Sequence, residues 1–400
     1  MGPGAGRLAG LPRYPLKHNR STVPLAHTFD VVTAVWGAEH RQLFLDVCVP
    51  NQLTRGNLEA LPAGSRYRVF TSADDEGVFR RSAALRRVSE LMTVDVVVMP
   101  ELSFSDRSPF TRMTACHIRA LTDACDRRSA VIFLCADHLF SVGAFAAIVR
   151  HHDTGIRAVM CTGVWVDRDA FLTALAARGA NRDLSSREMV AAAIEHLHPC
   201  SRFLMFDGMQ TTRRPQYVFW EVPGEGILAR CFHLHPLMVD PFHRDVLPEE
   251  TIDGHFVRRA CPDRRDVYVA ADSDEFVMFE MTRADDIKIA PVPGRMSLWT
   301  ASTMIVHCDS HQESYWTQAI HLHARDMGEA WTAVTHRSNR FATAAKTLGL
   351  ARRLLTARHF RRLARMERVR RDLRRAKKRA HRSVSVFLHA TARRVHKRAQ

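Results

Sequence analysis

Apolar and polar positions alternate along the first half of the chain in a repeating strand and helix order. Residues 130–135 form an unbroken apolar run that follows Ser129 and precedes Asp137, which predicts a strand buried on both faces. Further apolar or β-branched runs predict strands at 29–35, 67–71, 94–99 and 158–166, and helical spacing predicts helices at 39–49, 78–91, 109–127 and 143–151. This alternation favours an α/β fold with a mostly parallel sheet and helices on both faces.

Acidic residues follow several of these predicted strands. Asp74, Glu101 and Asp137 each come directly after one. Right-handed crossovers place the carboxyl ends of parallel strands along one edge of the sheet, where open α/β sheets bind ligands. Asp137 therefore either faces a ligand phosphate or its metal ion, or caps the helix that follows it.

The second half of the chain has a different pattern. Ser185 and Glu188 have the spacing of a capping box, which predicts a helix to about residue 197. Runs at 217–222 and 227–234 flank a Pro-Gly-Glu-Gly turn and predict a hairpin, and a strand is expected at 266–271. We assign residues 28–180 to a first half with the alternating strand and helix pattern and 181–340 to a second half with the hairpin and the His and Asp clusters.

Histidine pairs recur in this second half. His233 and His235 fall on a predicted strand, where residues two apart share a face, so they are either half of a divalent-cation site or two hydrogen-bonded strand-end histidines. The pairs His196/His198 and His321/His323 fall in predicted helices. Residues two apart on a helix point away from each other, so we interpret both of these pairs as structural.

Asp272, Asp274 and Glu275 crowd three acids into four residues after the predicted strand at 266–271. Neighbouring carboxylates raise each other's pKa unless a cation or hydrogen-bond donors offset the repulsion. The cluster is therefore a Mg²⁺ or Mn²⁺ site, a general base, or a solvated acidic turn.

The basic charge of the chain is confined to its end. The net charge is +16, from 58 Lys and Arg against 42 Asp and Glu, and residues 341–400 hold 20 of the basic residues but only 2 of the acids. Apolar residues at three- and four-residue spacing, among them Leu363, Met366, Val369 and Leu373, predict a basic amphipathic helix. An anionic membrane surface is its expected partner, with nucleic acid or packing on the body as alternatives.

The remaining composition bounds the setting. Nine scattered cysteines without a C-x-x-C pair are typical of free thiols in a reducing compartment. Residues 1–27 lack periodicity and read as a disordered leader, and no apolar stretch is long enough for a signal peptide or a membrane span. We expect a cytoplasmic protein, either free or peripheral at the inner membrane. The chain has no Walker loop, G-x-G-x-x-G, H-E-x-x-H or G-x-S-x-G motif.

Several short phrases resemble a group of bacterial GT-A-type glycosyltransferase-like proteins. They are Trp36-Gly37, Pro50-Asn51-Gln52-Leu53, Gly56-Asn57-Leu58, Ala136-Asp137-His138 with Ser141 and Gly143, Phe232-His233-Leu234-His235-Pro236, Thr251-Ile252-Asp253-Gly254 and Asp272-Ser273-Asp274-Glu275. The resemblance spans roughly residues 28–330. It implies a GT-A-like sheet and a nucleotide-sugar donor whose sugar passes to a glycan or lipid-linked acceptor of the envelope.

The resemblance also implies roles for residues. In GT-A enzymes an Asp-x-Asp holds Mn²⁺ or Mg²⁺ against the donor diphosphate; Asp137 matches its first Asp, but Leu139 stands in the place of the second. The expected donor-binding residues are Thr33, Trp36, Thr71, Asp74, Glu101 and Asp137, the expected metal ligands Asp137, His138, His233 and His235, and the expected bases Asp272, Asp274 and Glu275. The alternatives are a metal-dependent hydrolase or phosphoesterase built on His233, His235, Asp253 and Asp272, and a nucleic-acid-binding protein.

Overall fold

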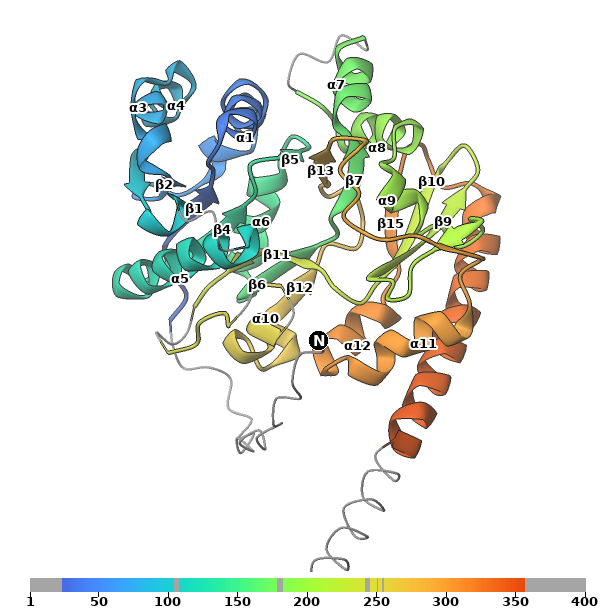
Figure 1. Ribbon diagram of the computed structural model, residues 1–400. Coiled ribbons are helices and arrows are strands. Elements are labelled where there is room, and N and C mark those ends of the chain that lie inside the picture. The colour runs from blue at the N-terminus through green and yellow to red at the C-terminus, as the bar shows by residue number, and fades with distance from the viewer. Residues whose placement is uncertain are drawn as a thin grey trace, which may run out of the picture.

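A computed structural model describes residues 24–103, 108–177, 183–241, 245–249, 251–253 and 255–356. Its centre is a seven-stranded sheet in the order β12-β6-β11-β4-β1-β2-β3 (Figure 1). The strands are β1 (Thr28–Ala34), β2 (Arg66–Thr71), β3 (Thr93–Val98), β4 (Ser129–Leu134), β6 (Ala158–Cys161), β11 (His235–Val239) and β12 (Val267–Val269). All neighbours are parallel except β11, which runs against β4 and β6. The predicted α/β fold with a mostly parallel sheet is confirmed.

The order of these strands creates a break in the direction of winding. The chain moves outward from β1 to β2 and β3, then returns to place β4 on the other side of β1. In open α/β sheets the crevice outside the carboxyl ends of two such strands is the place where ligands bind. The loops after β1 and β4 therefore frame the position at which a site is expected.

Helices cover both faces of this sheet. Successive residues of a strand point to opposite faces, and in β2 the Tyr67 hydroxyl donates to Gln52 while the Arg68 guanidinium donates to Asp123 at 2.7 Å. Gln52 ends α2 (Val49–Gln52), and Asp123 lies in α5 (Pro109–Arg127), whose bounds match the predicted helix. The helices α3 (Ala73–Arg81), α4 (Ala83–Ser89) and α6 (Ala144–Asp153) complete this half.

Two predicted elements are divided in the structure. The helix predicted at 39–49 consists of α1 (Ala38–Leu43), a π-helical turn η1 (Phe44–Cys48) and α2. The helix predicted at 78–91 begins earlier, as α3, and is interrupted at Ser82, whose side chain caps α4. Three 3₁₀ turns, η2 (Leu58–Ala60), η3 (Pro100–Ser103) and η4 (Arg264–Asp266), connect other elements.

The strand predicted at 158–166 also divides, at Thr162-Gly163, into two strands of different sheets. β6 stays in the central sheet, whereas β7 (Val164–Asp167) joins a small sheet in the order β5-β13-β7. Its other members are β5 (His138–Phe140), which follows Asp137, and β13 (Met278–Thr282). Asn51 fixes β5, because its amide bonds the Phe140 carbonyl and amide at 2.9 and 2.8 Å. This small sheet borders the carboxyl end of β4.

The second half adds a three-stranded sheet and its helices. The predicted hairpin is present as β9 (Tyr217–Val222) and β10 (Gly226–Cys231), and β15 (Ile320–His323) pairs with β10. The predicted capping box of Ser185 and Glu188 begins α8 (Ser186–Glu195). The other elements are α7 (Arg168–Ala177), α9 (Pro199–Arg202), β8 (Gln210–Thr211), α10 (His255–Ala260), β14 (Val292–Pro293), α11 (Leu298–His307) and α12 (Ser310–Thr317).

Two assignments for histidines are wrong in this half. His321 and His323 lie on β15 and not on a helix, and their rings are stacked with centroids 5.9 Å apart. Because β10 ends at Cys231 and β11 begins at His235, His233 lies in the connection and not on a strand. The physical reason is that the chain changes sheets here, from the hairpin to the central sheet, and strand pairing is interrupted at the crossing.

The last described residues form a helix that is part of the core. Its turns occupy residues 329–356, so it begins before the predicted start at Phe341. Trp331, Ala342 and Ala345 are buried in a second apolar cluster, and the Trp316 indole donates to the Ala342 carbonyl at 3.0 Å. The rest of the predicted tail, 357–400, and residues 1–23 of the predicted leader lie outside the described residues. Among the described residues, no helix combines the length and apolarity needed to cross a bilayer.

Candidate functional site

A pocket of about 370 Å³ opens beside the loops that follow β1 and β4. It is lined by residues of α1, of the loop after β4, of α7, and of β13 and the segment that follows it: Glu39, His40, Leu43, Asp137, Arg168, Met281, Thr282, Arg283, Asp285, Asp286 and Lys288. Most of these side chains are charged. The pocket therefore coincides with the winding break of the sheet, where the topology places a ligand.

Asp137 stands at the carboxyl edge of the sheet, as the sequence predicted. The Met281 amide donates to the Asp137 carbonyl at 2.9 Å, and the pairing of β5 with β13 holds the residues that follow. These backbone bonds leave the half-buried Asp137 side chain facing the pocket. Within the described parts of the chain its carboxylate has no hydrogen-bond or ion-pair partner, and the same is true of Asp286.

Lys288 brings a positive charge to this carboxylate. Desolvation acts to lower the pKa of Lys288, but the carboxylates of Asp137, Glu280 and Asp286 outweigh it and leave the pKa above its ordinary value. The ammonium therefore stays charged at neutral pH. An ammonium between carboxylates in an open pocket is a point charge available to a phosphate.

The two arginines of the pocket are already paired with acids. Arg168 donates to Glu39 at 2.6 Å and to Asp169 at 2.8 Å. Arg283 forms a two-pronged pair with Asp285, with both N–O distances 3.0 Å. These pairs fix the rim of the pocket. Lys288, in contrast, forms no hydrogen bond or close ion pair with the described residues, so it is the cation of the lining that is available beside Asp137.

Glu280 lies on β13 directly across from His138 of β5 and is the acid that the sequence reading missed. The Trp165 indole donates to its Oε2 at 2.8 Å. Its Oε1 occupies the space over Gly163, where an added Cβ would approach to 2.0 Å. Burial and then the Asp137 carboxylate raise the pKa of Glu280 to about 7, against the opposing effects of Lys288 and the Trp165 bond. A signal was present, because Glu280 interrupts the apolar run 276–281.

Cys135, Asp137 and His138 bring one possible ligand atom each to within 4.8 Å of one another. The donors of this group differ in availability. The Cys135 amide donates to His138 Nδ1 at 3.2 Å, and burial raises the pKa of the Cys135 thiol well above its usual range. The protonated thiol is a poor ligand, but His138 Nε2 is buried and has no hydrogen-bond partner among the described residues. Asp137 supplies the oxygen donor that Mg²⁺ or Mn²⁺ prefers.

Asp286 supplies a second carboxylate of the same pocket. Magnesium sites that use one or two carboxylates together with substrate phosphates are common, because Mg²⁺ retains several waters. The predicted ligands Asp137 and His138 thus stand in one group with Cys135, whereas His233 and His235 are not members of that group.

Burial lowers the pKa of the three histidines that were predicted as metal ligands. Burial and then the neighbouring His235 lower the pKa of His138 well below its usual range, and the two rings meet edge to face with centroids 5.0 Å apart. His235 Nε2 bonds the Phe133 carbonyl at 3.0 Å, and burial lowers its pKa. His233 Nδ1 lies 3.4 Å from the Gln312 amide nitrogen. Each ring thus has a structural partner.

The acids after β12 have partners of their own. Asp272 Oδ1 lies 3.2 Å from His323 Nε2, and Asp274 accepts two bonds from Arg187 at 2.9 and 2.8 Å. Glu275 accepts from Tyr268 at 2.7 Å and lies 2.6 Å from His151 Nε2. These contacts place the three acids in surface networks and assign them partners different from those of His233 and His235.

The exposed residue Asp253 acts electrostatically on both groups of the site. Its carboxylate raises the pKa of His233 and His235 against the effect of their burial, and it contributes to the raised pKa of Glu280. Asp253 therefore faces the same region as Glu280. Of the two acids in the hydrolase hypothesis, Asp253 thus acts electrostatically on His233 and His235. The other acid, Asp272, pairs with His323.

The predicted nucleoside residues lie at the expected strand ends but differ in exposure. Thr33 and Thr71 are fully buried, and their hydroxyls have no partner among the described residues. Asp74 is exposed, whereas its neighbour Asp75 is buried and accepts from the Gly37 amide at 2.7 Å, from Ser72 and from Arg41. Asp75 therefore shapes the turn after β1.

Trp36 and Glu101 flank the same edge. The Arg112 guanidinium stacks 5.0 Å from the centroid of the Trp36 ring and donates to the Leu102 carbonyl at 3.1 Å. One buried carboxylate oxygen of Glu101 has no partner among the described residues. A half-buried indole with nearby polar groups can stack against a planar ring.

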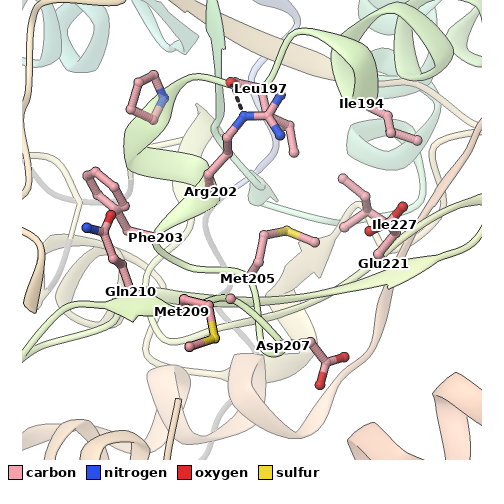
Figure 2. A pocket seen from close by; sticks show the side chains of 12 residues that line it. Ile194, Leu197, Arg202, Phe203, Met205, Asp207, Met209, Gln210, Glu221 and Ile227 are labelled. Atoms are coloured by element: carbon pink, nitrogen blue, oxygen red, sulfur yellow. Dashed lines mark hydrogen bonds between the residues drawn. The ribbon is translucent and has the colours of Figure 1, made fainter. Parts of the chain in front are cut away.

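A larger pocket, about 630 Å³, lies away from these groups (Figure 2). Its lining is mainly apolar, with Ile194, Leu197, Phe203, Met205 and Ile227, and polar side chains such as Arg202 and Glu221 stand around it. Arg202 is held by the Leu197 carbonyl at 3.1 Å. The larger pocket lacks the convergent titratable groups that line the smaller one, so the size of a pocket does not by itself identify the site.

Comparison with known proteins gives only remote likenesses. No family model and no curated protein matches the chain. Among solved structures, mouse xyloside xylosyltransferase 1 in its apo form is 12% identical with a TM-score of 0.23, covering 38% of this chain and 58% of its own. A putative glucose-1-phosphate thymidylyltransferase from Bacillus anthracis in complex with a sucrose is 11% identical with a TM-score of 0.22, covering 36% of this chain and 58% of its own. Both are similar to part of the chain, and the match spans 58% of the length of each of these structures.

Proposed function

We propose that this protein is a glycosyltransferase that binds a nucleotide-diphospho-sugar in the Asp137 pocket and transfers the sugar to a hydroxyl of a glycan or lipid-linked acceptor. The observation that carries the proposal is the placement of Asp137 and Lys288 at the winding break of the sheet, with Glu280 beside them. Open α/β sheets bind ligands at this edge, which supports a nucleotide there. The charges of Lys288 and Asp137 suit the binding of a diphosphate, the latter through a cation, and Glu280 suits the role of proton acceptor.

The donor diphosphate would lie against Lys288. Its ammonium is held charged by carboxylates, and it offsets the negative charge that develops on a leaving diphosphate. A divalent cation, when bound by Asp137 and Asp286, would neutralise more of that charge. The loop after β1, with Trp36 and the Asp75-fixed turn, would receive the nucleoside, because it forms the other wall of the crevice.

Glu280 would take the proton from the acceptor hydroxyl. A general base works best when its pKa lies near the operating pH, and the pKa of Glu280 is about 7. The Trp165 indole and the space over Gly163 hold its two oxygens in place. A base that acts directly on the acceptor is consistent with inversion at the anomeric carbon. Glu280 replaces Asp272, Asp274 and Glu275 in this role, because those acids are paired with surface partners.

The test is donor binding followed by transfer. We expect nucleoside-diphosphate sugars, screened by calorimetry with and without Mn²⁺, to bind the protein, and Asp137→Asn to weaken that binding at least about tenfold. Asp153→Asn is the matched control, since Asp153 is exposed and does not line the pocket. Glu280→Gln should keep donor binding but lose roughly 10²–10⁴ in transfer rate, the usual contribution of a general base.

The results that would contradict the proposal are specific. Equal donor binding by the wild type and Asp137→Asn would remove the site from the Asp137 pocket. Binding of Mn²⁺ with no donor binding, together with hydrolysis of phosphoesters, would favour the hydrolase alternative.

A further inference from the structure

Exposed apolar side chains gather where α11 begins and where the described part of the terminal helix ends. Leu298 and Trp299 in the first turn of α11 are 39% and 63% exposed, and Leu354 and Leu355 are 59% and 64% exposed. The chain has six tryptophans, and Trp299 is the exposed one, since the other five are buried or half-buried. We call Leu298, Trp299, Leu354 and Leu355, with Arg352, the α11 face.

This face is held rigidly by contacts between the two helices. The Arg352 guanidinium stacks 3.8 Å from the centroid of the Trp299 ring and donates to the Trp299 carbonyl at 3.0 Å. Arg353 donates to Glu313 at 2.7 Å and to the Cys308 carbonyl at 3.0 Å. An added Cβ at Gly349 would lie 2.3 Å from Ile305, so the helices are in close contact there. The terminal helix is therefore held in a fixed position beside α11 (Figure 1).

Basic residues outnumber acids in the segment that carries the leucines of this face. Residues 341–356 contain Lys346, Arg352 and Arg353 and no acid, and the sequence continues into residues 357–400 with 17 Lys and Arg against 2 acids. Repulsion between such segments opposes the association of two copies through this face. The same charge attracts a surface of phosphates.

We infer that the α11 face docks on an anionic lipid surface, with Trp299 and the leucines in the interfacial region and the basic residues at the headgroups. Tryptophan is enriched at membrane interfaces, and basic segments that carry apolar side chains bind there by burial and by charge together. Nucleic acid would use the basic residues but has no need of exposed leucines. The inference goes beyond the proposed transfer reaction and does not rest on it.

The first experiment compares variants of the full chain on vesicles. Phosphatidylcholine vesicles with and without phosphatidylglycerol are sedimented with the wild type, with Trp299→Ser/Leu355→Ser, and with Leu91→Ser/Met327→Ser. The last variant is the matched control, because Leu91 and Met327 are 49% and 59% exposed and lie outside the face. We expect the wild type and the control to bind the anionic vesicles with equal affinity. The face variant should bind them at least about tenfold more weakly.

A second measurement reports on Trp299 itself. Brominated phosphatidylglycerol should quench part of the wild-type tryptophan emission, and Trp299→Phe should remove that part while binding is retained. Leu354→Ser/Leu355→Ser provides a face variant that leaves the Arg352–Trp299 stack intact, in case the first variant is unstable. Unchanged vesicle binding by both face variants would overturn the inference. So would binding to a DNA duplex in the absence of vesicle binding, or no binding to either.

Discussion

Replacing Glu280 by Gln should change how the stability of the protein depends on pH, whatever its substrate. Burial and the Asp137 carboxylate raise the pKa of Glu280 from its ordinary 4.5 to about 7. In the unfolded chain the carboxyl loses its proton near pH 4.5, whereas in the folded protein it keeps the proton to about pH 7. The folded state therefore binds more protons between these values, and stability must fall as pH rises through the window.

The size of the effect follows from the same two values. At about 1.36 kcal/mol per pH unit, the gap between 4.5 and about 7 corresponds to about 3 kcal/mol of stability lost above pH 7. Gln has nearly the same shape and can still accept from Trp165, but it does not titrate. The Glu280→Gln protein should thus gain up to about 3 kcal/mol relative to the wild type at pH 8 and little at pH 4.5.

Urea unfolding at pH 5, 6, 7 and 8 measures this difference. Groups common to both proteins cancel when the variant is compared with the wild type at each pH. Asp74→Asn is the control, since this exposed carboxylate lies on the same sheet edge. A difference between Glu280→Gln and the wild type that stays constant from pH 5 to 8 would refute the reasoning, because it would show an ordinary carboxyl at position 280.

Two further predictions follow from close contacts. Gly163→Ala should displace the Glu280 carboxylate, since the new Cβ would clash with Oε1, and it should destabilise the protein by about 1–3 kcal/mol through loss of the Trp165 bond. Gly77→Ala is the control, since neither glycine has a positive φ and the Cβ added at Gly77 would meet only the flexible end of the Arg81 side chain, at 3.2 Å. Equal effects of the two substitutions on stability would contradict the prediction. Truncation after residue 356 should leave the thermal midpoint of unfolding nearly unchanged. Truncation after residue 340 should lower it, because Ala342 and Ala345 are buried and the Ala342 carbonyl accepts from Trp316. Equal midpoints would place residues 341–356 outside the core.

The sequence was sufficient for six of the seven strands of the central sheet, because apolar or β-branched residues mark them, whereas β11 was not predicted. Residues 130–135 predicted a doubly buried strand, and the strand found there, β4, is buried along its whole length. The acid after it falls at the predicted edge, since parallel strands leave no choice of side. Helix α5 was predicted to the residue, because Pro109 starts it and Arg128, at φ 57°, ends it.

The small sheet escaped prediction because its strands are short and pair over long separations. β5 has three residues, and β7 is continuous in the sequence with β6, so apolar character alone reads through the break at Thr162-Gly163. Its partner β13 comes more than a hundred residues later. Pairing of this kind depends on the folded arrangement, which local periodicity does not contain. His321 and His323 were misassigned for the same reason, since β15 has four residues and gains its strand structure from β10.

The turn at Asp137 lacks the second acid of an Asp-x-Asp motif, and the small sheet brings another acid, Glu280, close to it. Leu139 is buried at 3% exposure, so its position serves the core and not the pocket. The strand that pairs with β5 instead brings Glu280 opposite His138, and the fields of Asp137 and Lys288 act on it with opposite sign. On the proposed reaction, a bound diphosphate would neutralise Lys288 and so remove the charge that lowers the pKa of Glu280. Glu280 would then become a stronger base when the donor is in place, which couples proton removal from the acceptor to occupation of the donor site.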